Sequence, residues 1–186
     1  MSIDTGRLFY VMGPSGVGKD SFIQAVRACW GTRLLVAHRY ITRSAAAGGE
    51  NHIELCETEF QLRKDRGLFA LSWAANGHHY GVGREINDWL ASGMDVMVNG
   101  SRAYLPQART LFSERLYPVL VQVDAETLGQ RLRARGRENE AEICQRLERA
   151  AAYQLAPSDD VCWLDNSGNL ADTLRQFQRY QQLLPA

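Results

Sequence analysis

The sequence has no long hydrophobic run and no net charge. None of its 186 residues lies in an apolar stretch approaching the roughly 18 residues that a membrane-spanning helix needs, so we expect no membrane span. Lysine and arginine together number 21, as do aspartate and glutamate, which leaves no overall field to attract nucleic acid or a membrane surface. We therefore expect neither partner, and an anionic ligand requires a local cluster of lysine and arginine.

Cysteine is also scarce. The four cysteines, Cys29, Cys56, Cys144 and Cys162, are scattered and form no C-x-x-C pair. A zinc site or a redox motif requires closer spacing, so free thiols in a reducing compartment are the simpler interpretation. The first residues, Met1–Arg7, are polar and show no apolar signal region. We therefore expect the protein in the cytoplasm.

What the sequence does contain is the alternation of an α/β protein. Its length suits a single domain, and its hydrophobic content of 45% is ordinary for a globular chain. Apolar runs such as Leu8–Met12 and Pro118–Val123 indicate buried strands, and helical patterns separate them. This order predicts a mostly parallel sheet with helices on both faces. We expect further strands at Leu34–His38, Leu68–Trp73, His78–Val82, Val96–Val98 and Val161–Leu164, and helices at Ser21–Trp30, Glu59–Arg66, Arg84–Ala91, Ala103–Ser113, Glu126–Arg135, Glu138–Tyr153 and Leu170–Leu184.

The strongest chemical signal is the stretch GPSGVGKD, which follows the first predicted strand and opens the first predicted helix. It matches G-x-x-x-x-G-K, the phosphate-binding loop. Glycines let backbone N–H groups approach phosphate oxygens, the helix N-terminus favours the same anion, and Lys19 can reach the β- and γ-phosphates. A glycine-rich turn with an incidental lysine is the alternative. We expect ATP to bind Gly13, Pro14, Ser15, Gly16, Val17, Gly18, Lys19, Asp20 and Ser21, with Lys19 catalytic.

Asp20 departs from the motif, because a serine or threonine that binds Mg²⁺ usually stands at this position. A carboxylate is also a hard oxygen ligand, so Asp20 is our candidate for binding Mg²⁺ directly or through water. The alternative is a favourable acidic residue in the first turn of a helix. The neighbouring Ser21 offers a hydroxyl to the α-phosphate.

A second cationic cluster lies in the C-terminal half. Its arginines are Arg131, Arg133, Arg135 and Arg137 around Gly136, followed by Arg146. Arg131 and Arg135 are four residues apart and share one helix face. Arginine suits phosphate because its planar fork grips two oxygens. We expect a helical lid over about residues 126–150, with Arg131 and Arg135 catalytic and Arg146 facing the substrate; a solvated basic face is the alternative.

A third set of candidates follows the ends of predicted strands, where ligand sites gather in α/β folds. Its members are Arg39, Arg43, Glu50, Tyr80 and Arg102, with Gly48 and Gly49 in the first loop. The Tyr80 hydroxyl is a candidate donor to an acceptor phosphate, and a packing role is nearly as well supported. The adjacent His78 and His79 point to opposite faces of a strand, so we expect no joint metal site there.

These patches, in this order, resemble the guanylate-kinase family. The shared motifs are GPSGVGK, ITR followed by GE, YG, the RLRARGR stretch and RLERA, and they span roughly Leu8 to Leu174. The resemblance implies a P-loop NTPase fold with an acceptor-binding insertion over about residues 39–84 and an arginine-bearing lid. It further implies that Arg43 and Tyr80 hold the phosphate of the acceptor.

Two departures disfavour guanylate as the acceptor. The guanine-reading glutamate of the family falls at Leu71, and its hydroxyl residue falls at Val82. A site without these partners leaves the polar edge of guanine unpaired, which costs several powers of ten in discrimination. The stretches GPSGVGKDS, VNGSR, RARGRE and LDNSG instead resemble a branch of this family, the ribose 1,5-bisphosphate phosphokinases.

That closer resemblance implies a sugar-phosphate acceptor. The ATP γ-phosphoryl would pass, with Mg²⁺, to the 1-phosphate of ribose 1,5-bisphosphate, giving 5-phospho-α-D-ribose 1-diphosphate in phosphonate catabolism. Two alternatives stay open, a nucleoside-monophosphate kinase and a non-catalytic guanylate-kinase-like binding domain. An intact phosphate loop with lid arginines argues against the second. A homodimer is compatible with the sequence.

Overall fold

The computed structural model describes residues 6–47, 50–136, 139–152 and 160–184. Its centre is a five-stranded sheet in the order β2-β7-β1-β8-β9, and every neighbouring pair is parallel. The strands are β1 (Leu8–Met12), β2 (Leu34–Val36), β7 (Asp95–Asn99), β8 (Leu116–Gln122) and β9 (Cys162–Asp165). All five lie where the apolar runs predicted strands, with ends that differ by a few residues.

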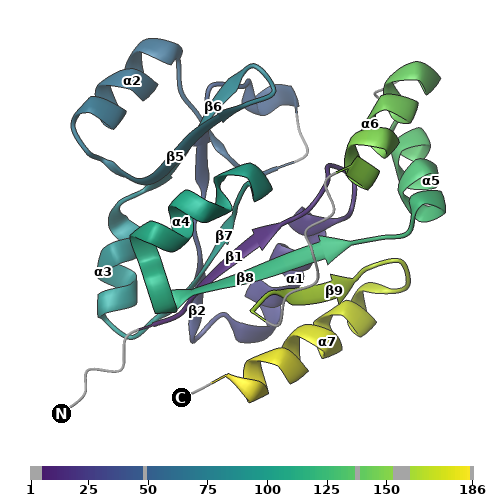
Figure 1. Ribbon diagram of the computed structural model, residues 1–186. Helices are drawn as coiled ribbons and strands as arrows, with labels where there is room; N and C mark the ends of the chain where they lie inside the picture. The colour runs from purple at the N-terminus through teal and green to yellow at the C-terminus, as the bar shows by residue number, and fades with distance from the viewer. Residues whose placement is uncertain (1–5, 48–49, 137–138, 153–159, 185–186) are drawn as a thin grey trace.

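Helices cover both faces of this sheet, as expected (Figure 1). Alternate residues of β1 enter two separate cores: Tyr10 packs with residues of α3 (Glu85–Ala91) and α4 (Leu105–Phe112), whereas Phe9 packs with residues of α1 (Lys19–Trp30) and α7 (Leu170–Leu183). The period of two along a strand buried on both sides thus produces three layers. Short 3₁₀ turns, η2 (Arg102–Tyr104) and η3 (Ser113–Arg115), flank α4.

The segment between β2 and α3 builds a second sheet of its own. Its strands, β3 (Arg39–Ile41), β4 (Ile53–Glu54), β5 (Phe69–Ala75) and β6 (His78–Gly83), lie in the order β4-β3-β6-β5, with the helix α2 (Glu57–Asp65) between β4 and β5 and the 3₁₀ turn η1 (Ala45–Ala47) after β3. The sequence predicted β5, β6 and α2 but not β3 and β4. Strands of three and two residues are too short to show a period of two.

Two helices form the segment predicted as a lid, α5 (Ala125–Arg135) and α6 (Glu140–Ala152). The Asp124 side chain caps α5 by accepting a hydrogen bond from Thr127 N at 2.7 Å, and Gly136 ends the helix with a φ of 62°. Arg137 and Glu138 lie outside the described residues, as do Gly48 and Gly49. In Figure 1, α5 and α6 lie on one side of the molecule and the second sheet on the other. Among the described helices, none has both the length and the apolar character needed to cross a membrane.

Phe177 of α7 anchors the core beneath the phosphate loop. Its ring is fully buried, with centroid distances of 5.2 Å to Phe9, 5.4 Å to Phe22 and 5.9 Å to Trp30. These edge-to-face contacts join β1, α1 and α7.

We expect Phe177→Ala to lower the free energy of unfolding by about 3–5 kcal/mol, because it removes a buried ring and leaves a cavity. Chemical denaturation measures the change. Leu183→Ala, on the same helix with the side chain 83% exposed, is the control and should stay near wild type. Equal losses for the two variants would contradict this description of the core.

Candidate active site

One cavity of about 1410 Å³ gathers nearly every side chain that the sequence predicted for the site. The predicted residues that line it are Gly13, Pro14, Ser15, Gly16, Gly18, Lys19, Asp20, Ser21, Arg39, Arg43, Glu50, Tyr80, Arg102, Arg131, Arg135 and Arg146. Val17 is the exception, because its side chain is buried in the core. Residues more than 100 positions apart in the chain thus face one space.

The phosphate loop owes its shape to glycines. Gly13, Gly16 and Gly18 have φ values of 151°, 96° and 90°, in the region where residues with a Cβ are strained. A Cβ on Gly13 would also come within 2.2 Å of the Val121 carbonyl oxygen. The helix α1 begins at Lys19, so its first N–H groups point to the cavity.

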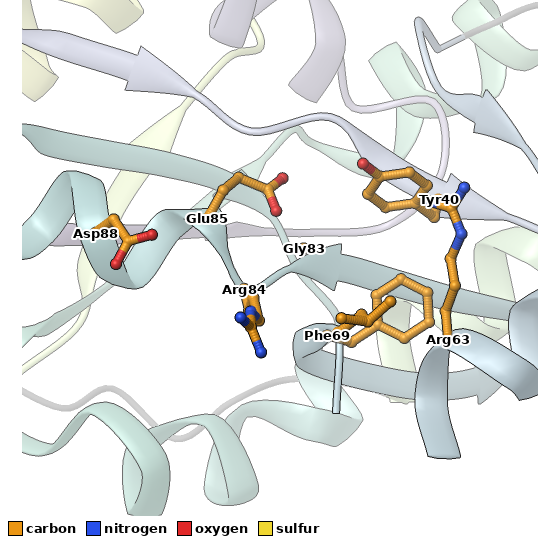
Figure 2. Close-up of a pocket in the computed structure, with 8 residues that line it drawn as sticks. Tyr40, Arg63, Phe69, Gly83, Arg84, Glu85 and Asp88 are labelled. Carbon is orange, nitrogen blue, oxygen red and sulfur yellow. The ribbon is translucent and has the colours of Figure 1, made fainter. Parts of the chain in front are cut away.

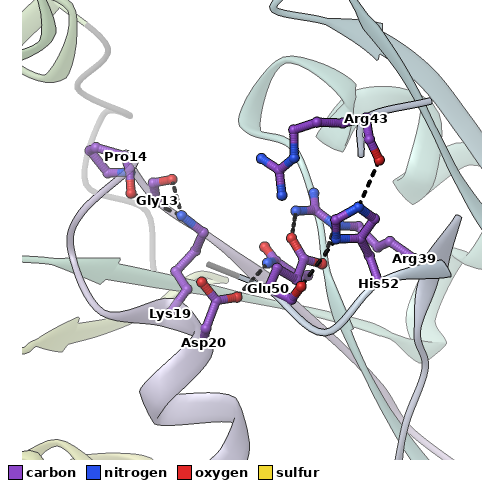
Figure 3. A network of polar contacts seen from close by, with 9 residues as sticks. Gly13, Pro14, Lys19, Asp20, Arg39, Arg43, Glu50 and His52 are labelled. Carbon is purple, nitrogen blue, oxygen red and sulfur yellow. Dashed lines mark hydrogen bonds and ion pairs between the residues drawn. The ribbon is translucent and has the colours of Figure 1, made fainter. Parts of the chain in front are cut away.

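The Lys19 side chain reaches back to the start of the loop. Its Nζ donates hydrogen bonds to the carbonyl oxygens of Gly13 at 2.8 Å and Pro14 at 2.9 Å (Figure 3). Burial lowers the pKa of Lys19 to about 8, and the nearby Asp20 carboxylate opposes that shift. A triphosphate beside this ammonium would favour its charged form.

Asp20 and Asn99 together offer oxygen atoms to a cation. Asn99 Nδ2 donates to Asp20 Oδ1 at 3.2 Å, while Asn99 Oδ1 is buried and accepts no hydrogen bond from the described residues. Burial raises the pKa of Asp20, and the Glu50 carboxylate adds to that rise. The described part of the chain has no group of three or more metal-binding side chains. One carboxylate and one amide oxygen fit Mg²⁺, which commonly completes its shell with phosphate and water oxygens.

The carbonyl oxygen of Val17 holds the loop against the rest of the protein. It accepts hydrogen bonds from Asn166 Nδ2 at 2.7 Å and from Arg131 Nη1 at 3.3 Å. Arg131 Nη2 also donates to the Asn166 carbonyl oxygen at 2.8 Å, and the Thr173 hydroxyl donates to Asn166 Oδ1 at 2.8 Å. A Cβ on Gly18 would lie 2.6 Å from Asn166 Nδ2, so this contact requires glycine. Arg131 therefore braces the loop from α5.

The other arginines of α5 and α6 differ in whether they face the cavity. Arg135 and Arg146 line the cavity, and so does Arg149, which the sequence analysis did not select. Arg133 does not line it; its Nε and Nη2 donate to the Glu140 carboxylate at 2.8 and 3.0 Å and so join α5 to α6. The spacing of four between Arg131 and Arg135 thus places both on the inner face of α5. Arg149 follows Arg146 by three residues, a spacing that could have identified it.

On the opposite side of the cavity, an ion pair rests on a stack of aromatic rings. Arg39 donates to the Glu50 carboxylate through Nε, at 2.7 Å, and through Nη2 (Figure 3). The Arg39 guanidinium lies 5.0 Å from the ring centroid of Tyr80. Trp73 in turn stacks on Tyr80 and Tyr104, each with a centroid separation of 5.6 Å. These contacts fix the orientation of the Arg39 guanidinium, which lines the same cavity as the phosphate loop.

Arg43 carries the clearest sign of a missing anion partner. It lines the cavity, and its Nε is buried without a hydrogen bond to any described residue. A buried guanidinium N–H without a partner is costly, and a phosphate oxygen would satisfy it. Of the two neighbouring histidines, His78 lines the cavity, whereas His79 does not, and its Nδ1 lies 2.5 Å from Glu57 Oε1.

Tyr10 positions the loop that follows β7. Its hydroxyl donates to the Ser101 carbonyl oxygen at 2.9 Å and accepts from Ser101 N at 2.8 Å. Burial strongly raises the pKa of Tyr10, which keeps the hydroxyl protonated and able to donate. A Cβ on Gly100 would come within 2.2 Å of the Tyr10 ring, so glycine permits this approach. The adjacent Arg102 thereby lines the cavity.

Leu71 and Val82, the positions of the family's guanine-reading groups, lie in the core. They are neighbours on β5 and β6, both are buried, and neither lines the cavity. The acceptor side of the site therefore presents arginine and aromatic groups, and it offers no carboxylate or hydroxyl at these two positions.

A second cavity of about 320 Å³ lies elsewhere on the second sheet (Figure 2). Its lining residues are Tyr40, Arg63, Leu68, Phe69, Gly83, Arg84, Glu85 and Asp88. It contains no residue that the sequence predicted for the site, and the Arg63 guanidinium already pairs with Glu59. The chemistry of phosphate therefore belongs to the larger cavity.

Solved structures share this fold. A crystal structure of guanylate kinase from Anaplasma phagocytophilum has a TM-score of 0.63 at 16% identity and covers 97% of this chain and 88% of its own. An unliganded sugar kinase from Janibacter has a TM-score of 0.56 at 20% identity and covers 97% of this chain and 96% of its own. At such identities the likeness concerns the fold alone, and it confirms the expected P-loop NTPase class.

Curated relatives share about half of their residues with this chain, although no family model matches it. The "Ribose 1,5-bisphosphate phosphokinase PhnN" of Enterobacter lignolyticus is 54% identical over 173 residues, which cover 93% of this chain and 90% of that protein. The protein of the same name from Pantoea vagans is 53% identical over 178 residues, 95% of this chain and 98% of its own. Similarity of this extent over nearly the whole length shows kinship as well as fold. The chain belongs to the family of ribose 1,5-bisphosphate phosphokinases.

Proposed function

We propose that this protein transfers the γ-phosphoryl group of ATP to the 1-phosphate of ribose 1,5-bisphosphate and releases 5-phospho-α-D-ribose 1-diphosphate and ADP. One observation carries the proposal: the phosphate loop, the lid arginines and Arg43, whose Nε has no hydrogen-bond partner among the described residues, line the same cavity. Such a cavity can hold two phosphorylated molecules with their phosphates facing each other. The curated relatives bear the name of this activity.

Positioning and charge neutralisation account for the reaction. An ionised phosphate oxygen of the acceptor attacks in line, so the site needs no strong general base. Lys19 and the arginines on the inner face of the lid offset the charge that spreads over the moving phosphoryl group. Arg43 orients the acceptor, supported by Tyr80 and by Arg39 on its aromatic stack.

Asp20 would hold Mg²⁺, and beside it lies Asn99 Oδ1, which accepts no hydrogen bond from the described residues. When bound, the cation would supply positive charge to the β- and γ-phosphate oxygens. Asp20 carries the hard oxygen that the usual serine or threonine hydroxyl provides at this position, and the cation would offset the raised pKa of that carboxyl.

The same proposal assigns residues 39–84 to acceptor binding and residues 126–150 to the lid. It also places the reaction in phosphonate catabolism and the protein in the cytoplasm, where the four free cysteines would stay reduced. Leu71 and Val82 favour an acceptor without a base, because the core buries both side chains.

The acceptor is tested by incubating the protein with ATP, Mg²⁺ and either ribose 1,5-bisphosphate or GMP and following the release of ADP. We expect the sugar phosphate to give the larger kcat/KM, since nothing at Leu71 or Val82 can pair with guanine. Preferential turnover of GMP would instead support the nucleoside-monophosphate kinase.

Lys19→Ala should reduce kcat on the order of a hundredfold or more, because it removes a charge that stabilises the transition state. Steady-state rates with saturating substrates measure the loss, and circular dichroism checks the fold. Arg133→Ala is the matched control, since Arg133 pairs with Glu140 outside the cavity. A folded Lys19→Ala enzyme with wild-type turnover would refute the proposed role of the loop.

ATP binding should also take up protons at alkaline pH. With a pKa of about 8, Lys19 is partly neutral at a pH somewhat above that value, and the triphosphate recharges it. Affinity for ATP should therefore fall as the pH rises through about 8. Calorimetry in two buffers of different ionisation enthalpy measures the uptake, which should be absent in Lys19→Arg, since arginine stays charged. Equal heats in both buffers for the wild type would exclude this coupling.

A further inference from the structure

His52 lies just before β4, is only 7% exposed, and directs both ring nitrogens at main-chain carbonyl oxygens. Nδ1 is 3.0 Å from the Glu50 oxygen and Nε2 is 3.0 Å from the Arg43 oxygen (Figure 3). A carbonyl oxygen only accepts hydrogen bonds, and a neutral imidazole carries a single N–H. Only the doubly protonated ring can therefore donate to both oxygens.

The two carbonyl groups belong to residues whose side chains face the cavity. Arg43 presents the buried Nε that has no partner among the described residues. Glu50 binds Arg39 through both carboxylate oxygens and so sets the direction of that guanidinium. His52 thus links the main chain at Arg43 to the main chain at Glu50. Arg43 is one of the guanidinium groups that face the cavity, and Glu50 orients another, Arg39. Its own side chain does not line the cavity.

Charged groups of both signs surround this segment. They are Arg43 and Glu50 on the loop itself, Arg39 on β3, Glu54 on β4 and His78 on β6.

We propose that His52 is a positioning residue for the acceptor: its two ring N–H groups clip the main chain at Arg43 and Glu50 and so hold the cationic acceptor site in its binding geometry. This inference rests on the proposed function for the identity of the acceptor, whereas the clip itself does not depend on it. Acceptor binding should then depend on a residue that does not line the cavity.

Three substitutions at His52 remove the donors in steps. His52→Gln keeps an amide N–H near the position of Nε2, His52→Asn keeps one near Nδ1, and His52→Leu keeps neither. We expect His52→Leu to raise the KM for ribose 1,5-bisphosphate about tenfold, with smaller increases for the two amides. The KM for ATP and kcat should stay near their wild-type values, because the phosphate loop is untouched.

His38→Gln is the matched control, since His38 Nε2 lies 3.1 Å from Asn51 Nδ2 in the same segment and His38 does not line the cavity. We expect its KM for ribose 1,5-bisphosphate to stay near the wild-type value. An unchanged KM in His52→Leu, or an equal increase in His38→Gln, would overturn the clip.

Hydrogen exchange separates this inference from the proposed function, because it needs no acceptor. Backbone amides of residues 44–47 and 50–51 should exchange faster in His52→Leu than in the wild type, while those of α7 should not change. Unchanged exchange in this segment, or equal losses of ATP and acceptor affinity, would sink the proposal. A wild-type protein that fails to turn over ribose 1,5-bisphosphate would count against the proposed function and leave the exchange result to judge the clip.

Discussion

The fixed position of the Val17 carbonyl oxygen underlies the rest of the site. Asn166 at the end of β9 and Arg131 on α5 both donate to it, so one atom joins the phosphate loop to the sheet and to α5. The glycines that shape the loop have no side chains with which to hold it, and within the loop Lys19 bonds only the carbonyl oxygens of Gly13 and Pro14 among the described contacts. Long-range hydrogen bonds supply the rigidity that preorganised N–H groups need if they are to stabilise charge.

This chain has no net charge, yet its site is strongly cationic because arginines from several parts of the chain are gathered there. Arginines arrive from the second sheet, from the loop after β7 and from both α5 and α6, and they converge near the end of β1. The cost appears in the lowered pKa of Lys19 and the raised pKa of Asp20, both caused chiefly by burial. Bound phosphates and a cation would relieve both shifts, as is typical of sites built for charged ligands.

The sequence predicted what local spacing encodes. The phosphate loop, five central strands and the shared face of Arg131 and Arg135 all follow from periods of two or four or from a contiguous motif. The hydrogen bond from Asn166 to the Val17 carbonyl oxygen could not be predicted in this way. It joins residues 149 positions apart, and an asparagine after a strand has many uses. The sequence analysis missed the short strands β3 and β4 for a different reason. Pairing with the rest of the second sheet determines them, and their local sequence pattern does not.

The acceptor side shows how composition redirects a shared fold. At the two positions where resemblance to the guanylate-kinase family implies polar groups that read a base, this chain has the buried side chains of Leu71 and Val82. Its cavity is lined by the Arg39–Glu50 ion pair, which packs on stacked aromatic rings. A guanylate kinase and a sugar kinase share this fold, so the fold by itself does not determine the acceptor.

The most direct test of the account is a crystal structure with Mg²⁺, a non-hydrolysable ATP analogue and ribose 1,5-bisphosphate bound together. The account predicts the γ-phosphate on the loop between Gly13 and Lys19, within hydrogen-bond distance of Lys19 Nζ, and the 1-phosphate of the acceptor in line with it beside Arg43. A triphosphate bound away from this loop, or an acceptor whose 1-phosphate faces away from it, would contradict the central claim.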